Sequence, residues 1–159
     1  MGTHLQRTFA VIDIENLCGG PDNVDHLQRY IRYLYDQLSD GSWMPIIASS
    51  SHTVRRCPNM WWTWPDARRL HRTGCDAADT ALLDALSEPT AARSSHVEIW
   101  SGDHIFTKAV RELTRSGVDV TVRAAPGTLS RQLRHVSTRA HELVELTFVT
   151  EAIDWRPAA

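Results

Sequence analysis

Short apolar runs that end in polar turns recur along this chain, and helical patterns separate them. Residues 8–14 and 96–100 are nearly continuous in apolar character, as are strands buried on both faces of a parallel sheet. Residues 24–38 repeat apolar side chains at helical spacing, and residues 77–86 have the alanine and leucine content of a helix. This alternation predicts an α/β fold of three layers, α/β/α, with a mostly parallel central sheet.

The remaining segments complete the alternation with less regular patterns. Further strands are expected at residues 43–48, 67–71 and 118–122, and further helices at residues 59–62, 105–114 and 130–135. Residues 49–51 are expected to form a hydroxyl-rich turn, and Pro89 is expected to close the helix at 77–86. Residues 142–148 fit either a helix or a final strand.

Length and composition indicate one globular domain, residues 1–159. The chain has 159 residues, 42% of them hydrophobic and 23% charged, and no apolar run approaches the roughly 20 residues that a membrane span needs. The amino terminus carries no apolar signal region, so we expect a cytoplasmic protein that does not enter a membrane. A net charge of −2 excludes a strongly basic nucleic-acid-binding domain.

The three cysteines, Cys18, Cys57 and Cys75, form no C-x-x-C pair. Their number is odd, which argues against a disulfide scaffold and against a structural zinc site. We therefore expect each of them to be a small buried or half-buried thiol.

Aspartates occur at three places along the chain, at the ends of two expected strands and at the start of one expected helix. Asp13 lies where the first strand ends, Asp103 follows the strand at 96–100 in a Ser-Gly-Asp turn, and Asp76 and Asp79 begin the helix at 77–86. Ligands of such sheets bind beyond the carboxyl ends of the strands, so the three segments can converge. Several carboxylates at one sheet edge favour a hard divalent cation, which commonly serves phosphate chemistry.

Each of these residues also has a purely structural interpretation. Asp13 and Asn16 can cap backbone groups of a turn, and Asp76 can be the N-cap of its helix. His104 can be a polar loop contact without a role in proton transfer. Asp84 lies about 140° around the helix from Asp79 and is therefore the weaker site candidate.

Three motifs, in order, resemble the NYN branch of the PIN-like ribonuclease superfamily. They are Val11-Ile12-Asp13-Ile14-Glu15-Asn16, Gly74-Cys75-Asp76-Ala77-Ala78-Asp79 and Trp100-Ser101-Gly102-Asp103-His104-Ile105-Phe106. The resemblance covers about residues 8–122. No single motif is specific, and their order and context carry the resemblance.

The resemblance implies a metal-dependent ribonuclease with a three-layer fold. Asp13, Asp79 and Asp103 would bind one or two Mg²⁺ or Mn²⁺ ions, with Asp76 as a fourth catalytic acid and Asn16 near the substrate phosphate. We therefore expect water to attack phosphodiester bonds within single-stranded RNA. Many NYN domains carry a second acid two residues after the acid of the Ser-Gly-Asp turn, where this chain has Ile105. That departure favours the alternative of a catalytically silent module that binds RNA or a protein.

Cationic and aromatic residues suggest where RNA would bind. The candidates are Arg55, Arg56, Arg131, Arg134 and His104, and a basic segment spans residues 123–139. Trp61, Trp62 and Trp64 lie near arginines, as in sites that bind single strands, but we favour their burial in the core or in an interface. The sequence leaves open a homodimer.

A small-molecule phosphatase is a third class, and the sequence disfavours it. No glycine-rich phosphate loop with its lysine is present. Glu15 stands where a phosphoaspartate-forming phosphatase would have a second aspartate after Asp13.

Overall fold

The structure is a computed structural model that describes residues 8–20, 24–58, 64–74 and 76–143. Its elements run in the order β1 (Thr8–Asp13), α1 (Ile14–Cys18), α2 (Val24–Leu38), β2 (Trp43–Ser50), α3 (Ser51–Arg56), β3 (Arg68–Arg72), α4 (Ala77–Leu86), α5 (Pro89–Arg93), β4 (His96–Trp100), η2 (His104–Phe106, a 3-10 helix), α6 (Thr107–Arg115), β5 (Asp119–Ala124), α7 (Arg131–Val136) and β6 (Arg139–Glu142).

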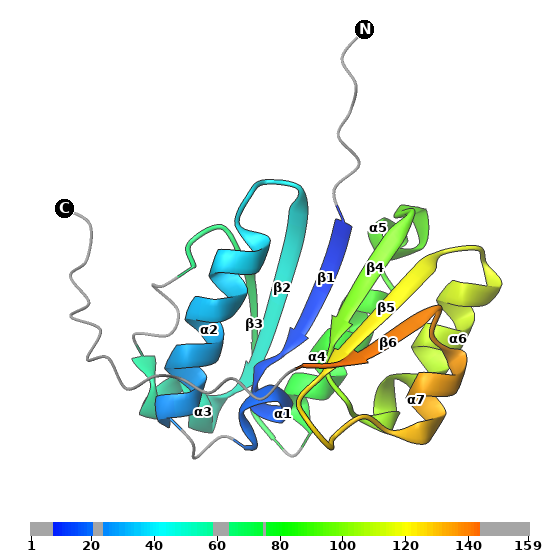
Figure 1. The fold of residues 1–159 in the computed structure, drawn as a ribbon. Coiled ribbons are helices and arrows are strands. Elements are labelled where there is room, and N and C mark those ends of the chain that lie inside the picture. The colour runs from blue at the N-terminus through cyan, green and yellow to red at the C-terminus, as the bar shows by residue number, and fades with distance from the viewer. Residues whose placement is uncertain (1–7, 21–23, 59–63, 75, 144–159) are drawn as a thin grey trace, which may run out of the picture.

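The six strands form one sheet in the order β3-β2-β1-β4-β5-β6, and every neighbouring pair is parallel. Figure 1 shows the strands side by side with α2 across one face. The predicted α/β class and its three layers are confirmed, and the sheet is parallel throughout. Among the described residues, no helix is long and apolar enough to cross a membrane.

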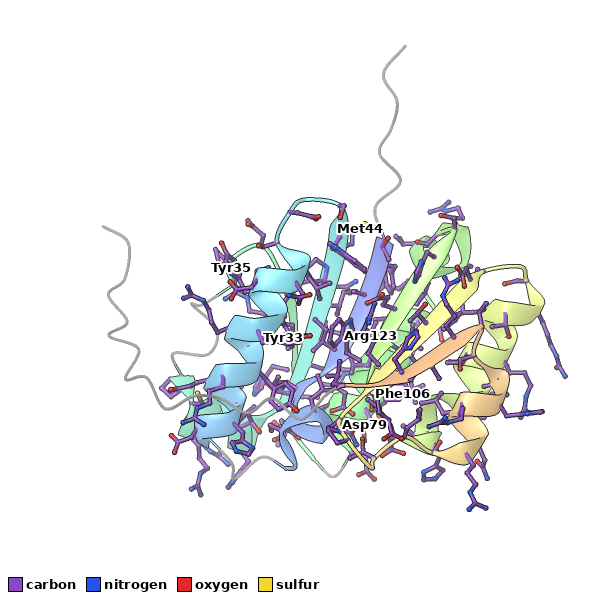
Figure 2. All side chains as sticks on the ribbon, viewed as in Figure 1. Tyr33, Tyr35, Met44, Asp79, Phe106 and Arg123 are labelled. Atoms are coloured by element: carbon purple, nitrogen blue, oxygen red, sulfur yellow. The ribbon has the colours of Figure 1, made fainter. Side chains whose placement is uncertain are left out.

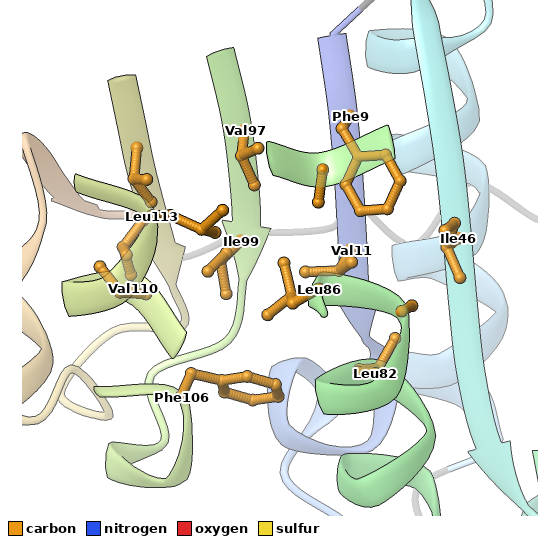
Figure 3. Close-up of a cluster of buried hydrophobic side chains, with 14 of the residues drawn as sticks. Phe9, Val11, Ile46, Leu82, Leu86, Val97, Ile99, Phe106, Val110 and Leu113 are labelled. Carbon is orange, nitrogen blue, oxygen red and sulfur yellow. The ribbon is translucent and has the colours of Figure 1, made fainter. Parts of the chain in front are cut away.

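Two hydrophobic clusters fill the two sides of the sheet. One packs Phe9, Val97 and Ile99 against helices α4, α5, α6 and α7, as Figure 3 shows in part. The other packs Ile12 and Trp100 against α1 and α2. Neighbouring residues of one strand thus belong to different clusters, so the central strands are buried on both faces. This is why their sequences are nearly continuous apolar runs.

The strand order changes direction between β1 and β4. From β1 the chain adds β2 and β3 on one side of β1, and then β4, β5 and β6 on the other side. In doubly wound sheets this switch point opens a crevice beyond the carboxyl ends of the strands, where ligands bind. Asp13 ends β1, and Asp103 follows β4 by three residues. The topology therefore brings two predicted site residues to one crevice.

Most of the predicted elements are confirmed. The helices at residues 24–38 and 77–86 and the strand at 96–100 have the predicted bounds, and the other strands and α7 differ by one or two residues at their ends. The predicted helix at 105–114 is divided into η2 and α6, and the fully buried Phe106 lies at the junction.

Three predictions need correction. The turn predicted at residues 49–51 is the end of β2 and the start of α3, where the Ser50 hydroxyl accepts a hydrogen bond from the Thr53 backbone N–H at 3.4 Å. A serine at that position favours a helix start. Pro89 does not close α4 but begins α5, since proline suits the first helical turn.

The third correction concerns the last strand, β6, which was not predicted because residues 142–148 were expected to hold the final element. Only Glu142 and Leu143 of that range lie among the described residues, and the helix predicted at 59–62 lies outside them. Trp61, Trp62 and Cys75 also lie outside them. Cys18 and Cys57 are buried thiols, as predicted.

Candidate functional site

Asp13 is the buried centre of the site, with 3% of its surface exposed. Its Oδ1 accepts a hydrogen bond from the Asn16 backbone N–H at 3.1 Å, which caps α1. Its Oδ2 accepts one from the Ser101 hydroxyl at 2.9 Å. The predicted capping role is therefore present, and a second bond joins the end of β1 to the end of β4.

Burial raises the pKa of Asp13 from 3.8 to about 7, and the negative charge of Asp79 adds to the rise. The hydrogen bonds from Asn16 and Ser101 oppose it by favouring the carboxylate. Near neutral pH this carboxyl group therefore exchanges a proton. A buried acid without a compensating cation costs folding free energy whenever it is ionised.

The turn after β4 is fixed by contacts to both neighbouring loops. Gly102 donates its backbone N–H to the Asn16 side-chain oxygen at 3.0 Å, and its carbonyl accepts from the Ser130 N–H at 2.9 Å. A side-chain Cβ at Gly102 would lie 2.4 Å from the Thr128 carbonyl oxygen. Only glycine fits this close approach between the two loops.

Asp103 follows this turn and is half-buried. Its Oδ1 accepts a hydrogen bond from the Ile105 backbone N–H at 3.0 Å, which caps η2, and lies 2.9 Å from His104 Nδ1. The imidazole of His104 is itself exposed, so it can contact a ligand from solvent while it remains next to Asp103. His104 therefore lies beside the acid of the turn, and its predicted contact with a substrate stays a prediction.

Asp76 and Asp79 lie at the start of α4, and the charge of Asp103 acts on Asp79. Burial raises the pKa of Asp79 from 3.8 to about 6, and the charges of Asp103, Asp76 and Glu15 add to the rise, in that order. We call Asp13, Asp76, Asp79 and Asp103 the acid cluster. Figure 2 shows Asp79 at the lower end of the sheet.

Asp76 occupies the N-cap position of α4, as the sequence allowed, but without a capping hydrogen bond from its side chain. Its backbone has φ +52°, in the left-handed region that non-glycine residues rarely adopt. Its carbonyl oxygen accepts from the Thr80 N–H and hydroxyl, both at 3.0 Å. The exposed carboxylate is thus left available to a ligand, and the strained backbone is typical of functional sites.

Glu15 lies near enough to raise the pKa of Asp13 and Asp79 slightly, but its Oε1 is engaged by contacts that the sequence did not reveal. Its Oε1 accepts hydrogen bonds from the Ser50 N–H and hydroxyl, both at 2.7 Å, and from the Thr53 hydroxyl. Glu15 therefore ties α1 to the start of α3. The hydroxyl groups of Ser50 and Thr53, at the end of β2 and in α3, were the sequence feature that could have predicted a carboxylate partner there.

Among the described residues, no lysine or arginine forms an ion pair with the acid cluster, and His104 is the basic side chain that contacts Asp103. Asp84, the weaker site candidate in the sequence, forms an exposed ion pair with Arg72 at 2.6 Å. Over residues 8–20, 24–58, 64–74 and 76–143, no three His, Cys, Asp or Glu side chains are close enough to bind an ion together.

The chemistry of the donors nevertheless suits a hard divalent cation. Asp13, Asp79 and Asp103 supply carboxylate oxygens, which Mg²⁺ and Mn²⁺ prefer, and a cation would offset the burial and the repulsion that raise the pKa values of Asp13 and Asp79. These three residues are therefore the ones that could hold a metal ion, once their side chains move closer together than they are in this structure.

The predicted arginines lie on both sides of the acid cluster. Arg131 and Arg134 are exposed on α7, which packs against η2 next to Asp103. Arg134 lies 3.1 Å from Glu142, whereas Arg131 has no ion pair within the described part of the chain. Arg55 and Arg56 are exposed in the last turn of α3, beyond β2.

Other basic residues are engaged elsewhere. Arg123 donates two hydrogen bonds of 3.0 Å to the buried Glu98, and its guanidinium lies 5.3 Å from the centre of the Trp100 ring. Arg139 pairs with Asp119. Trp64 is 2% exposed and belongs to the core, as the favoured interpretation of the tryptophans predicted.

Comparisons with known proteins show the fold. The chain is similar to the crystal structure of a protein of unknown function from Vibrio parahaemolyticus, with a TM-score of 0.62 and 15% sequence identity over 91% of this chain and 98% of that one. No protein-family model and no curated protein matches the sequence. At this level of identity the likeness concerns architecture alone.

Proposed function

We propose that this protein is a metal-dependent ribonuclease that cleaves phosphodiester bonds within single-stranded RNA. One observation carries the proposal: the acid cluster lies at the switch point of the sheet, with its buried member at a pKa of about 7. Carboxylates gathered without lysine or arginine are costly for folding and suit a cation that arrives with, or before, a substrate. The resemblance of the three motifs to NYN domains supports the same activity.

Asp13, Asp79 and Asp103 would hold Mg²⁺ or Mn²⁺, and Asp76 would contribute a further carboxylate. When bound, such an ion lowers the pKa of a water molecule and stabilises charge on phosphoryl oxygens. The chain's own contribution is to fix the ligands. Ser101 and the Asn16 backbone hold both oxygens of Asp13, and Ile105 and His104 hold one oxygen of Asp103.

Arg131 and Arg55 would bind phosphates on either side of the acid cluster. Both are exposed, and neither has an ion pair within the described part of the chain. Phosphate contacts of this kind position a nucleic acid without reading its sequence. His104 is exposed beside Asp103 and would contact the substrate near the cleaved bond. A cytoplasmic location and a homodimer remain predictions from the sequence.

Cleavage of a labelled single-stranded RNA in the presence of Mn²⁺ tests the proposal. Asp79→Asn and Asp103→Asn are expected to lower the cleavage rate by at least about a hundredfold, since each removes a cation ligand. Asp84→Asn is the matched control, because it also removes one aspartate charge from α4 but lies in an exposed pair with Arg72. Undiminished cleavage by both cluster variants would refute a metal-dependent mechanism at this site.

Substrate contacts are tested by a second matched pair. Arg131→Gln is expected to raise KM severalfold with little change in kcat, because a phosphate contact remote from the reacting atoms contributes to binding. Arg115→Gln removes the same charge from the exposed end of α6, at the other end of the sheet, and is expected to leave KM unchanged.

A silent RNA-binding module is the second candidate, and Ile105 favours it. Ile105 occupies the position at which many NYN domains carry another acid, and its side chain packs against the core cluster of β4 and α6. Such a module would bind RNA without cleaving it, and Mn²⁺ would not shift its unfolding temperature. Measuring RNA binding, cleavage and the Mn²⁺ response of the same preparation separates the two functions.

A further inference from the structure

A pocket of about 510 Å³ opens at the amino-terminal end of the sheet, where nothing so far has been assigned. It is formed by the starts of β1 and β2, the loop between α2 and β2, and the segment that leads into β3. Figure 2 shows Met44, one of its lining residues, at the end of the molecule opposite to Asp79. A volume of this size is typical of sites for small organic ligands.

Three aromatic side chains, Phe9, Trp43 and Trp64, line the pocket. Phe9 and Trp64 are both 2% exposed, and Trp43 is half-buried at the start of β2. Tyr35 packs edge-on against Trp64, with ring centres 6.0 Å apart, and so fixes that ring. The faces of aromatic rings carry partial negative charge and attract cations.

Three charged side chains line the same pocket. Arg68 and Glu88 neutralise each other through two parallel contacts of 2.8 Å between guanidinium and carboxylate. Asp66 is exposed and makes no hydrogen bond or ion pair with any described residue. The pocket therefore combines aromatic walls with one uncompensated negative charge.

We propose that this pocket binds a small organic cation that carries an alkylated ammonium group. Trp43 contacts the methyl or methylene groups of the cation above a floor that contains the buried Trp64, and Asp66 supplies the opposite charge. A neutral apolar ligand would leave Asp66 without a role, and an anion would meet a carboxylate and an arginine already paired to Glu88. The proposal is independent of the acid cluster and of any activity there.

Calorimetric titration of the full chain with choline tests the proposal. The comparison ligand is 3,3-dimethylbutan-1-ol, which has the same shape but no charge. Choline is expected to bind at least about tenfold more tightly, because stacking of a desolvated cation on tryptophan and pairing with a carboxylate are both lost in the alcohol. Equal affinity for the two ligands, or no binding of choline at about 10 mM, would overturn it.

Two variants assign the interaction to these residues. Asp66→Asn is expected to weaken choline binding about tenfold and to leave binding of the alcohol unchanged. Asp25→Asn, an equal change of charge at an exposed position on α2, is the control. Trp43→Leu preserves an apolar wall and is expected to reduce the preference for choline over the alcohol. Equal weakening by Asp66→Asn and Asp25→Asn would contradict a specific counter-charge.

Discussion

Replacing Asp13 by asparagine is expected to stabilise the protein at alkaline pH while abolishing any metal-dependent activity. The asparagine side chain keeps the size of Asp13, and its oxygen can still accept from the Asn16 N–H that caps α1. What the substitution removes is a charge buried to 3% exposure. Between the ordinary pKa of 3.8 and about 7, at about 1.4 kcal/mol for each pH unit, that charge costs about 4 kcal/mol once fully ionised.

The direction of the pH effect follows from proton binding. A carboxyl group whose pKa is raised on folding binds more protons in the folded state than in the unfolded state between pH 3.8 and about 7. The free energy of unfolding therefore falls as the pH rises through that range, and this contribution is fully lost above about pH 7. The Asp13→Asn protein lacks the titrating group, so its stability falls much less over the same range.

Urea unfolding at pH 5 and pH 8 measures the effect. At pH 8 Asp13→Asn is expected to be more stable than the unchanged protein by about 3 to 4 kcal/mol, a large fraction of the 5–15 kcal/mol typical of a domain. Asp84→Asn, exposed and paired with Arg72, is the control and should be neutral or slightly destabilising. An Asp13→Asn protein no more stable than the unchanged one at pH 8 would refute the account of a buried, repelled charge.

Other contacts lead to separate expectations. Gly102→Ala is expected to destabilise the protein by about 1–3 kcal/mol in urea unfolding, because the new Cβ would meet the Thr128 carbonyl oxygen at 2.4 Å; wild-type stability would show that this approach relaxes freely. Arg123→Met is expected to cost about 2–3 kcal/mol by leaving Glu98 buried without its cation, and an additional Glu98→Gln change should recover part of that loss. Burial raises the pKa of Cys18 to about 11, so iodoacetamide at pH 8 should label it only on unfolding, as mass spectrometry can show; fast labelling of the native protein would contradict its burial.

The layered fold could be predicted from the sequence because its central elements bury apolar faces. The helix at residues 24–38 turns Leu27, Ile31 and Leu34 into one cluster, and β4 is buried on nearly every residue. When one face of an element is buried, apolar residues recur along the sequence at the spacing of that element. The same reasoning placed Asp13 and Asp103 at strand ends, since their positions follow from where the apolar runs stop.

The elements that were missed are stabilised by contacts between distant residues. α3 begins where Ser50 and Thr53 bind Glu15, which is 35 residues before Ser50 in the chain. β6 has exposed Arg139 and Glu142 at its ends and is held by pairing with β5, not by an apolar face. Such contacts produce no periodic pattern, so single-sequence reasoning cannot find them.

Asp76 shows a different limit. Its position at the start of α4 was correctly predicted, but an acid at a helix start is ordinarily a cap. In the structure Asp76 is the N-cap residue, but it has a left-handed backbone and its carboxylate makes no capping hydrogen bond. The preceding Gly74, at φ +128°, shows that the turn before α4 has an unusual backbone, which residue type alone does not specify.

The cost of the acid cluster is itself an argument for function. The hydrogen bond from the Asn16 N–H that caps α1 could equally be accepted by an asparagine oxygen, so a residue needed only for that cap would spare the protein a buried charge. The ionised form of Asp79 is likewise disfavoured, first by burial and then by its acidic neighbours. Two carboxylates that weaken the fold at one switch point, with no lysine or arginine there among the described residues, are explained when a cation supplies the missing positive charge. Ile105 does not change this inference, because its backbone anchors Asp103 whatever its side chain is.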